Sequence, residues 1–255
     1  MSRFTEGRKS VKYNNLDLYQ RCGLKCVDLE TYVEDEFGIK RSVTFTGSTL
    51  INIEDNRFNV RLTFTRVKVG NNMNSRNLIE LDDDFIREIS GVIYEKEVNI
   101  LEYNDMLYYV VPISGSIQKM NDIGHFSIEF ESLSPYCYSP IFTHFVPVDT
   151  TDIDYIEELR NNGVNMTNAD LYIECIQDGN LEINNRDNKI IITNAKAGDV
   201  IEIKGDTNEV QFNSNCSIDY NYKALELNCG ANRVRVNTNS NFEIVFKFQE
   251  EYGLV

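Results

Sequence analysis

Two histidines and one cysteine are the residues of this chain that a nucleophilic mechanism would most readily use. His125 and His144 are its only imidazoles, and Cys137 precedes His144 closely enough for a cysteine–histidine dyad to be drawn. Each histidine lies in an apolar, strand-like stretch, where a structural or surface imidazole is the commoner role. No local signature marks Cys137 as a nucleophile. We therefore predict no catalytic residue.

The other common catalytic and cofactor-binding patterns are absent from the sequence. It contains no Gly-x-Ser-x-Gly nucleophile elbow, phosphate-binding loop or Rossmann glycine pattern, so we expect no cofactor. Paired carboxylates for glycoside cleavage stay open, because some of 40 acidic residues will always lie near one another. A cell-wall hydrolase is therefore the less favoured alternative to a protein that is not an enzyme.

The cysteines favour structural roles over metal binding. Cys22 and Cys26 have no second pair and no nearby histidine to complete a zinc site, so we predict no metal. Cys137, Cys175 and Cys229 lie in or beside apolar strand-like runs, where a reduced thiol behaves as a small hydrophobe. We expect the six cysteines to be reduced and mostly buried: Cys22, Cys26, Cys137, Cys175, Cys216 and Cys229.

The acidic run Asp82-Asp83-Asp84 also has a structural explanation. Residues 83–94 carry apolar side chains at spacings of three and four, which predicts an amphipathic helix. Carboxylates at a helix start accept hydrogen bonds from free N–H groups and complement the helix dipole. A calcium loop would need alternate ligands, a glycine and a distal glutamate, and these are missing.

Acidic residues outnumber basic ones along the chain. The formal net charge is −15 and no Lys/Arg cluster interrupts the excess, which disfavours binding to nucleic acid through its phosphates. An acidic surface would instead let DNA pass without sticking. No secretory signal and no apolar run of roughly 20 residues is present, so we expect synthesis in the cytoplasm and no membrane insertion.

Strand patterns surround the predicted helix and fill the rest of the chain. The first part alternates apolar and polar residues over 42–46, 58–64, 98–103, 107–111 and 124–131, the third and fourth of these forming a hairpin around Asn104-Asp105. Strands then recur about every ten residues, which predicts a sandwich or jelly-roll-like barrel. They are 171–176, 189–193, 199–204, 209–212, 233–236 and 242–248, divided by turn formers at 178–179, 184–185, 205–206 and Gly230.

The prolines indicate where the chain divides. All four lie between positions 112 and 147, as is typical of the end of a folded unit. We predict an N-terminal domain over residues 1–140 and a C-terminal domain over 170–255. Between them we expect a linker over 141–169, with one short helix at 154–160.

Tyrosines offer the most plausible binding face, although strand packing explains them more simply. The chain has 14 Tyr and no Trp, and Tyr108-Tyr109 or Tyr220 with Tyr222 could present rings to a ligand. The absence of Trp slightly disfavours a carbohydrate-binding role.

The motifs of the first part occur in a specific order. After the helix come residues 101–105, the Tyr108-Tyr109 strand, and Phe126-Ser127-Ile128-Glu129-Phe130 closing on Ser134-Pro135-Tyr136-Cys137-Tyr138-Ser139. This order resembles the distal tail (Dit) family of long-tailed phages, in which such a strand leads into a Pro-Tyr pair. Residues 198–203, 225–227, 230–236 and 242–248 are similar to the closing strands of that family's second domain. The resemblance covers residues 37–255.

The resemblance implies a mainly β, non-catalytic structural protein. Its α+β N-terminal ring-forming domain would have one helix, and its C-terminal domain would be a galectin-like or jelly-roll β-sandwich. A homo-hexameric ring would lie at the distal end of the virion tail, between the tail tube protein and the tail-tip proteins, and DNA would pass through its lumen without specific binding. The alternative is that the C-terminal domain binds a carbohydrate or carries a receptor-binding protein.

Overall fold

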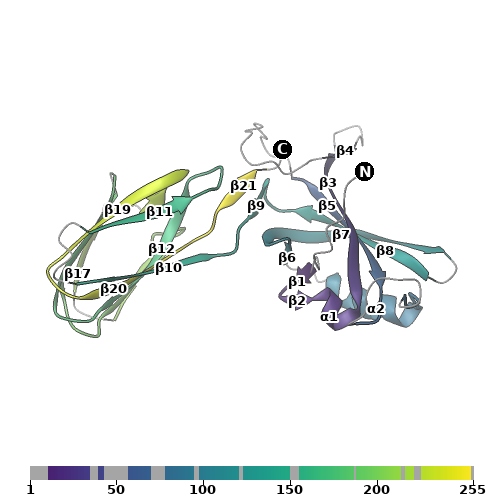
Figure 1. Ribbon diagram of the computed structural model, residues 1–255, viewed down its shortest axis with the longest axis horizontal. Coiled ribbons are helices and arrows are strands. Elements are labelled where there is room, and N and C mark those ends of the chain that lie inside the picture. Colours follow the sequence, from purple (N-terminus) through teal and green to yellow (C-terminus); the bar gives the residue numbers. More distant parts are fainter. Residues whose placement is uncertain are drawn as a thin grey trace. The chain divides into compact units, whose positions relative to one another are not determined.

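The protein is mainly β and divides into two units. The computed structural model describes residues 11–34, 40–42, 57–69, 78–94, 98–120, 123–149, 155–186, 188–213, 216–220 and 225–253. Within them the strands are antiparallel and two helices occur, which confirms the predicted fold class (Figure 1). The first unit comprises Met1–Tyr138 with Gly253–Val255, and the second comprises Ser139–Tyr252.

The first unit is built on one twisted sheet. Its strands follow the order β2-β1-β6-β7-β8-β5-β3-β4, and β9 pairs with β7. Their bounds are β1 Val11–Tyr13, β2 Leu16–Asp17, β3 Leu24–Glu34, β4 Lys40–Ser42, β5 Asn59–Arg66, β6 Asn99–Tyr103, β7 Met106–Met120, β8 Ile123–Ser132 and β9 Tyr136–Tyr138.

Strict alternation of apolar and polar residues explains why the strands of this sheet form where they do. In β5, Val60, Leu62 and Phe64 are fully buried on one face, while the residues between them are partly exposed on the other. The predicted strand at 58–64, the hairpin and the strand at 124–131 are confirmed by β5, β6 with β7, and β8. Of the strand expected at 42–46, only Ser42 is described, in β4; residues 43–46 lie outside the described residues.

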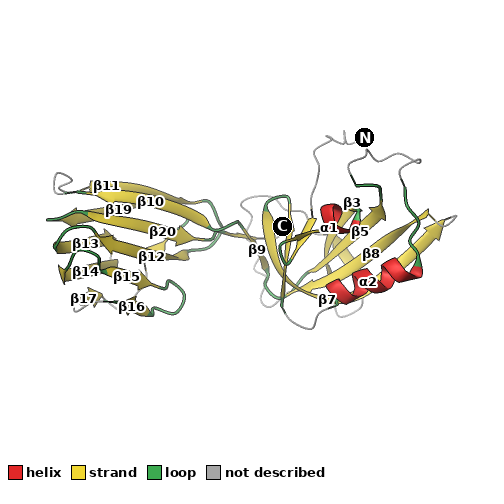
Figure 2. Ribbon diagram, turned by 90° about the horizontal axis from the view of Figure 1, so that it is seen from below, coloured by secondary structure: helices red, strands yellow, loops and turns green. Residues whose placement is uncertain are grey.

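Two helices lie against this sheet (Figure 2). Helix α2, Asp83–Ile93, confirms the predicted helix and buries Phe85, Ile89 and Ile93. The short α1, Leu18–Cys22, was not expected, since one helix was predicted for the domain. It ends at Gly23, whose φ of +70° favours glycine and where a Cβ atom would overlap the Val67 carbonyl oxygen.

The second unit is a β-sandwich of two antiparallel sheets. The first, called the β20 sheet, has the order β10-β20-β12-β15-β16, with β18 beside β12; the second, the β19 sheet, has the order β11-β19-β13-β14-β17. The bounds of the β20 sheet are β10 Phe142–Val148, β20 Phe242–Phe248, β12 Thr167–Cys175, β15 Val200–Ile203, β16 Val210–Phe212 and β18 Leu225–Leu227. The bounds of the β19 sheet are β11 Tyr155–Asn161, β19 Gly230–Thr238, β13 Gly179–Asn185, β14 Asn188–Ala195 and β17 Ser217–Tyr220. The last strand of the chain, β21 Glu251–Gly253, belongs to neither sheet of the sandwich.

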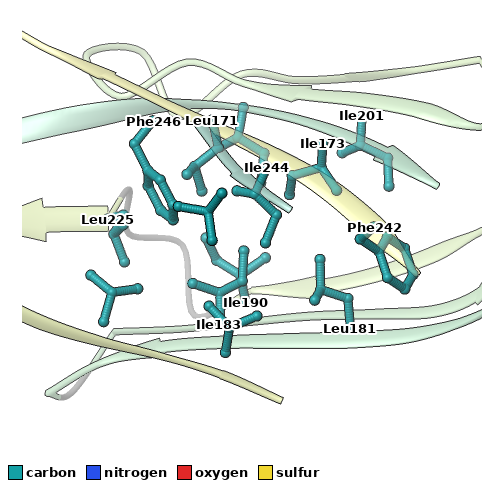
Figure 3. Packing of buried hydrophobic residues seen from close by; sticks show 14 of the residues in the cluster. Leu171, Ile173, Leu181, Ile183, Ile190, Ile201, Leu225, Phe242, Ile244 and Phe246 are labelled. Carbon is teal, nitrogen blue, oxygen red and sulfur yellow. The ribbon is translucent and has the colours of Figure 1, made fainter. Parts of the chain in front are cut away.

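The two sheets meet in a continuous apolar core. Figure 3 shows Leu171, Ile173, Ile244 and Phe246 of the β20 sheet facing side chains of the β19 sheet such as Ile183. Each of these side chains is completely shielded from solvent. Burial of this kind contributes roughly 25 cal/mol per Å² of apolar surface, so the core is the main source of stability of this unit.

The predicted linker over 141–169 and its helix at 154–160 are wrong. Most of that range belongs to the sandwich, as β10, β11 and the start of β12. Strand β11 pairs along its whole length with β19 and buries Leu159 and Asn161. The prolines misled the prediction, because Pro147 lies within β10, an outermost strand that needs no donor on its free edge.

The predicted turn at 184–185 is also wrong, since both asparagines end β13 and Asn185 is buried. The expected strands from 171 onward are confirmed by β12, β14, β15, β16, β19 and β20. Strand β18 coincides with residues 225–227, which the family resemblance gave as a closing strand, whereas β10, β11, β13 and β17 were not predicted.

Replacing Phe246 by alanine should destabilise the second unit by about 3–5 kcal/mol, because the cavity left in a closed core adds to the lost burial. Phe212→Ala is the matched control: this ring is 50% exposed and should cost less than about 1 kcal/mol. Chemical denaturation measures both values. Equal losses for the two variants would contradict the core assignment.

Candidate functional site: surfaces and buried polar groups

The histidines occupy structural or surface positions. His125 is exposed on β8. His144 Nε2 lies 2.8 Å from Glu157 Oε1, and the Tyr155 hydroxyl donates to Glu157 Oε2 at 2.5 Å. Since β10 and β11 are the outermost strands of the two sheets, this cluster joins the two sheets at one edge of the sandwich. The geometry therefore explains His144 without a catalytic role.

The buried thiols are poorly suited to nucleophilic chemistry. Cys137 is fully buried, and burial raises the pKa of its thiol to about 12, so it is protonated at neutral pH. Burial also raises the pKa of Cys175, whose Sγ donates to the Gln177 carbonyl oxygen at 3.1 Å. Cys216 is buried too, whereas Cys229 is exposed, contrary to the expectation that it acts as a small core hydrophobe.

The acidic run caps helix α2 as predicted. The Asp82 carboxylate accepts a hydrogen bond from the Phe85 backbone N–H at 2.7 Å and lies 3.0 Å from Arg66 Nη1. The backbone hydrogen bond, followed by the guanidinium, holds the pKa of Asp82 below its ordinary value. Asp83 and Asp84 occupy the first turn, where negative charge is favourable.

Neither metal binding nor a membrane span is indicated in the part of the chain that the structure describes. No group of three or more His, Cys, Asp or Glu side chains there could hold a metal ion. Cys26 Sγ instead donates to the Asp28 carbonyl oxygen at 3.3 Å. Among the described helices, none is long and apolar enough to cross a membrane.

The tyrosines expected as a possible binding face pack within the first unit. Tyr108 is buried and meets Phe58 edge-on at 6.2 Å, and burial raises the pKa of its hydroxyl. Tyr109 meets Tyr138 in the same way at 5.1 Å. Only the backbone of Tyr220 is described, in β17, and Tyr222 lies outside the described residues.

A shallow hollow of about 270 Å³ opens beside helix α2. Its lining contains three cations, Arg21, Arg66 and Lys68, but also Glu88. Arg66 is already engaged, because its guanidinium lies 3.8 Å above the Phe85 ring and pairs with Asp82. Because Arg66 is already paired and Glu88 offsets the other cations, we do not consider the hollow a binding site. Its full lining is Arg21, Cys22, Gly23, Arg66, Val67, Lys68, Val69, Ile79, Phe85 and Glu88.

Exposed apolar side chains occur on and beside β6, β7 and β8 of the first unit's sheet. Val98 and Ile113 are about half exposed, and Ile100 lies across from Tyr109 on the neighbouring strand. The Leu133 N–H donates to the Tyr109 carbonyl oxygen, which brings Leu133 to the same strands. We call Val98, Ile100, Ile113 and Leu133 the apolar patch. Exposed apolar side chains on neighbouring strands are typical of surfaces that take part in protein–protein contacts.

This patch was not predicted from the sequence, although the sequence contains a signal for it. Residues 98–103 and 107–111 contain apolar residues at outward as well as inward positions, which a strand with one solvent-facing side does not need. Recognising the patch required the register that places Ile100 beside Tyr109.

Comparison with solved structures gives a clear likeness. The crystal structure of SPP1 Dit (gp 19.1), described as a paradigm of the hub adsorption apparatus in phages infecting Gram-positive bacteria, is similar with a TM-score of 0.57. The likeness spans 96% of this chain and 99% of that chain at 11% sequence identity. The resemblance to the distal tail family predicted from the sequence is thus confirmed at the level of the fold. No family model and no curated protein matches the sequence.

Alkylation should distinguish buried from reactive thiols. With iodoacetamide at mildly alkaline pH, Cys229 should be modified quickly, whereas Cys137 should react only after unfolding, because it is shielded and protonated. Peptide mass spectrometry with and without denaturant measures both rates. Rapid native-state labelling of Cys137 would reopen the case for a nucleophile.

Removing the helix cap should lower stability in a pH-dependent way. Asp82→Ala is expected to lower Tm by a few degrees at neutral pH, and Asp84→Ala, an exposed first-turn control, by less. The stabilisation by Asp82 is present above the ordinary aspartate pKa of 3.8 and is lost as the pH falls through its depressed folded-state pKa. Thermal melts over acidic pH test this; a pH-independent difference would be inconsistent with it.

Proposed function

We propose that this protein is a structural hub of a long-tailed phage, forming a homo-hexameric ring between the tail tube and the tail tip. The observation that carries the proposal is the likeness to SPP1 Dit, which extends over both units and nearly the full length of both chains. At 11% identity that likeness concerns the fold, so function is inferred from it by analogy. The tail tube protein, the tail-tip proteins and a receptor-binding protein are the expected partners.

The surface of the first unit supports a role in assembly. A closed ring requires a heterologous contact, in which one surface of each copy meets a different surface of the next. The apolar patch is a suitable contribution to such a contact, because covering Val98 and Ile113 would remove apolar area from water. A monomer in solution gains nothing from leaving these side chains exposed.

The environments of the cysteine thiols and of His144 support a non-catalytic role. Cys137 and Cys175 are buried and the pKa of each thiol is raised, and His144 lies within hydrogen-bonding distance of Glu157 at the edge of the sandwich. The two residues of the cysteine–histidine dyad that the sequence allows, Cys137 and His144, therefore each have a structural explanation.

The distribution of charge bears on how DNA would pass through the ring. Residues 1–138 contain 21 acidic and 16 basic side chains, a net charge of −5, and residues 139–255 contain 19 and 9, a net charge of −10. Six copies of the first segment would still surround the lumen with an excess of negative charge. DNA would then cross it without the phosphate contacts that cause binding.

Light scattering of the purified chain tests the ring. Six copies of 29.5 kDa should give a particle of about 177 kDa. Val98→Asp with Ile113→Asp in the apolar patch should lower the assembled fraction at least tenfold, because burying two unpaired carboxylates is costly. Val69→Asp, a control of similar exposure outside the patch, should leave the mass unchanged. A monomer at all concentrations would exclude the ring.

A further inference from the structure

The two outer faces of the sandwich carry different charges. In β20 and β12 the inward residues form the core, so Asp170, Glu174 and Glu243 point outward, and Lys247 is the single outward cation of these two strands. Asp170 is also paired with Lys204, which follows β15, at 3.7 Å. In β11 and β19 the outward charged residues are Arg160, Arg233 and Arg235, with a single carboxylate, Glu158. We call these surfaces the acidic face and the basic face. One bears a net charge of −2 and the other of +2 on those strands.

The acidic face contains two carboxylates that repel each other. Glu174 of β12 lies directly across from Glu243 of β20 in the antiparallel register. Neither has an ion-pair partner among the described residues, and like charges at opposed positions destabilise a sheet. An external cation placed between them would relieve this repulsion.

An exposed apolar row runs beside this carboxylate pair. Phe145 lies across from Val245, which lies across from Tyr172, so the three side chains form one line over β10, β20 and β12. Phe145 is 52% exposed and Tyr172 37% exposed, although both are large and ring-bearing. Aromatic side chains next to charge are typical of protein contacts.

The basic face has the complementary arrangement. Ile156 of β11 is 50% exposed and lies across from Arg235, and the next outward pair is Glu158 with Arg233. An apolar side chain therefore stands beside guanidinium groups on this face, as the apolar row stands beside carboxylates on the other. Guanidinium is the cation best suited to bridge two carboxylates at a contact.

We propose that the second units of neighbouring copies stack on one another, the acidic face of one against the basic face of the next. Arg233 and Arg235 would approach Glu174 and Glu243, and Ile156 would cover the row of Phe145 and Tyr172. Because the two faces differ, the contact is heterologous and can follow a ring of copies. This contact would add to the one made by the first units in the proposed ring. The inference rests on the proposed hub function only in assuming six copies.

Photo-crosslinking of the full-length protein tests the contact directly. A benzoylphenylalanine at position 172 (Tyr172→benzoylphenylalanine), in a mixture of isotopically light and heavy chains, should crosslink to β11 or β19 of another copy. The same substitution at Met166, an exposed residue directly before β12, should not. Peptide mass spectrometry identifies the joined strands.

Reversing the charges of each face in turn provides two variants that should rescue each other when mixed. Glu174→Arg with Glu243→Arg, and separately Arg233→Glu with Arg235→Glu, should each lower the crosslink yield at least tenfold, because each pairs like charges across the contact. Mixing the two variants should restore it, since every contact in an alternating assembly then joins opposite charges. Restoration on mixing also shows that both variants are folded.

The outcomes separate this inference from the proposed function. A hexameric mass without crosslinks to β11 or β19, or with yields unaffected by charge reversal, overturns the stacking and leaves the ring intact. Crosslinks between these faces in a particle that does not contain six copies support the stacking and overturn the hexamer. Crosslinks from position 172 only to another protein or to a saccharide added at high concentration also overturn the stacking.

Discussion

Face-to-face packing of two antiparallel sheets is the interaction on which the second unit depends. Side chains alternate between the faces of a strand, so each residue committed to the core commits its neighbours to the outer surface. With Leu171, Ile173 and Ile244 inside, Asp170, Tyr172 and Glu243 must point outward. The acidic and basic faces are thus consequences of the same register that closes the core. A slip of one residue would bury the charges and expose the isoleucines.

The same alternation explains what could be predicted from the sequence. Helix α2 and strands such as β5, β8, β12 and β20 have regular periods and few competing signals, and they occur where expected. Strands β10 and β11 were mistaken for a linker with one short helix at 154–160, because the four prolines were taken to mark the end of a folded unit. In the fold, Pro147 lies on an outermost strand and Glu157 faces His144, so both residues are compatible with pairing.

A buried polar residue caused the error at residues 184–185. Asn185 was expected in a turn, but it is buried and donates through its side-chain amide to the Glu226 carbonyl oxygen. Such a contact joins residues far apart in the chain, and no local pattern announces it. The two surface features could not be predicted either, because they too depend on contacts between residues far apart in the sequence. The apolar patch and the Glu174–Glu243 pair exist only once strands are placed side by side in register.

The proposed hub role joins these features in one physical account, in which surfaces rather than reactive groups do the work. The first unit offers an apolar patch and the second offers two faces of opposite charge, while the buried thiols pack inside the fold and His144 pairs with Glu157 at an edge of the sandwich. Electron cryo-microscopy of phage particles that carry the protein measures the central claim most directly. The account predicts six copies in an annulus between tail tube and tail tip. A single copy per particle, or density elsewhere in the virion, would contradict it.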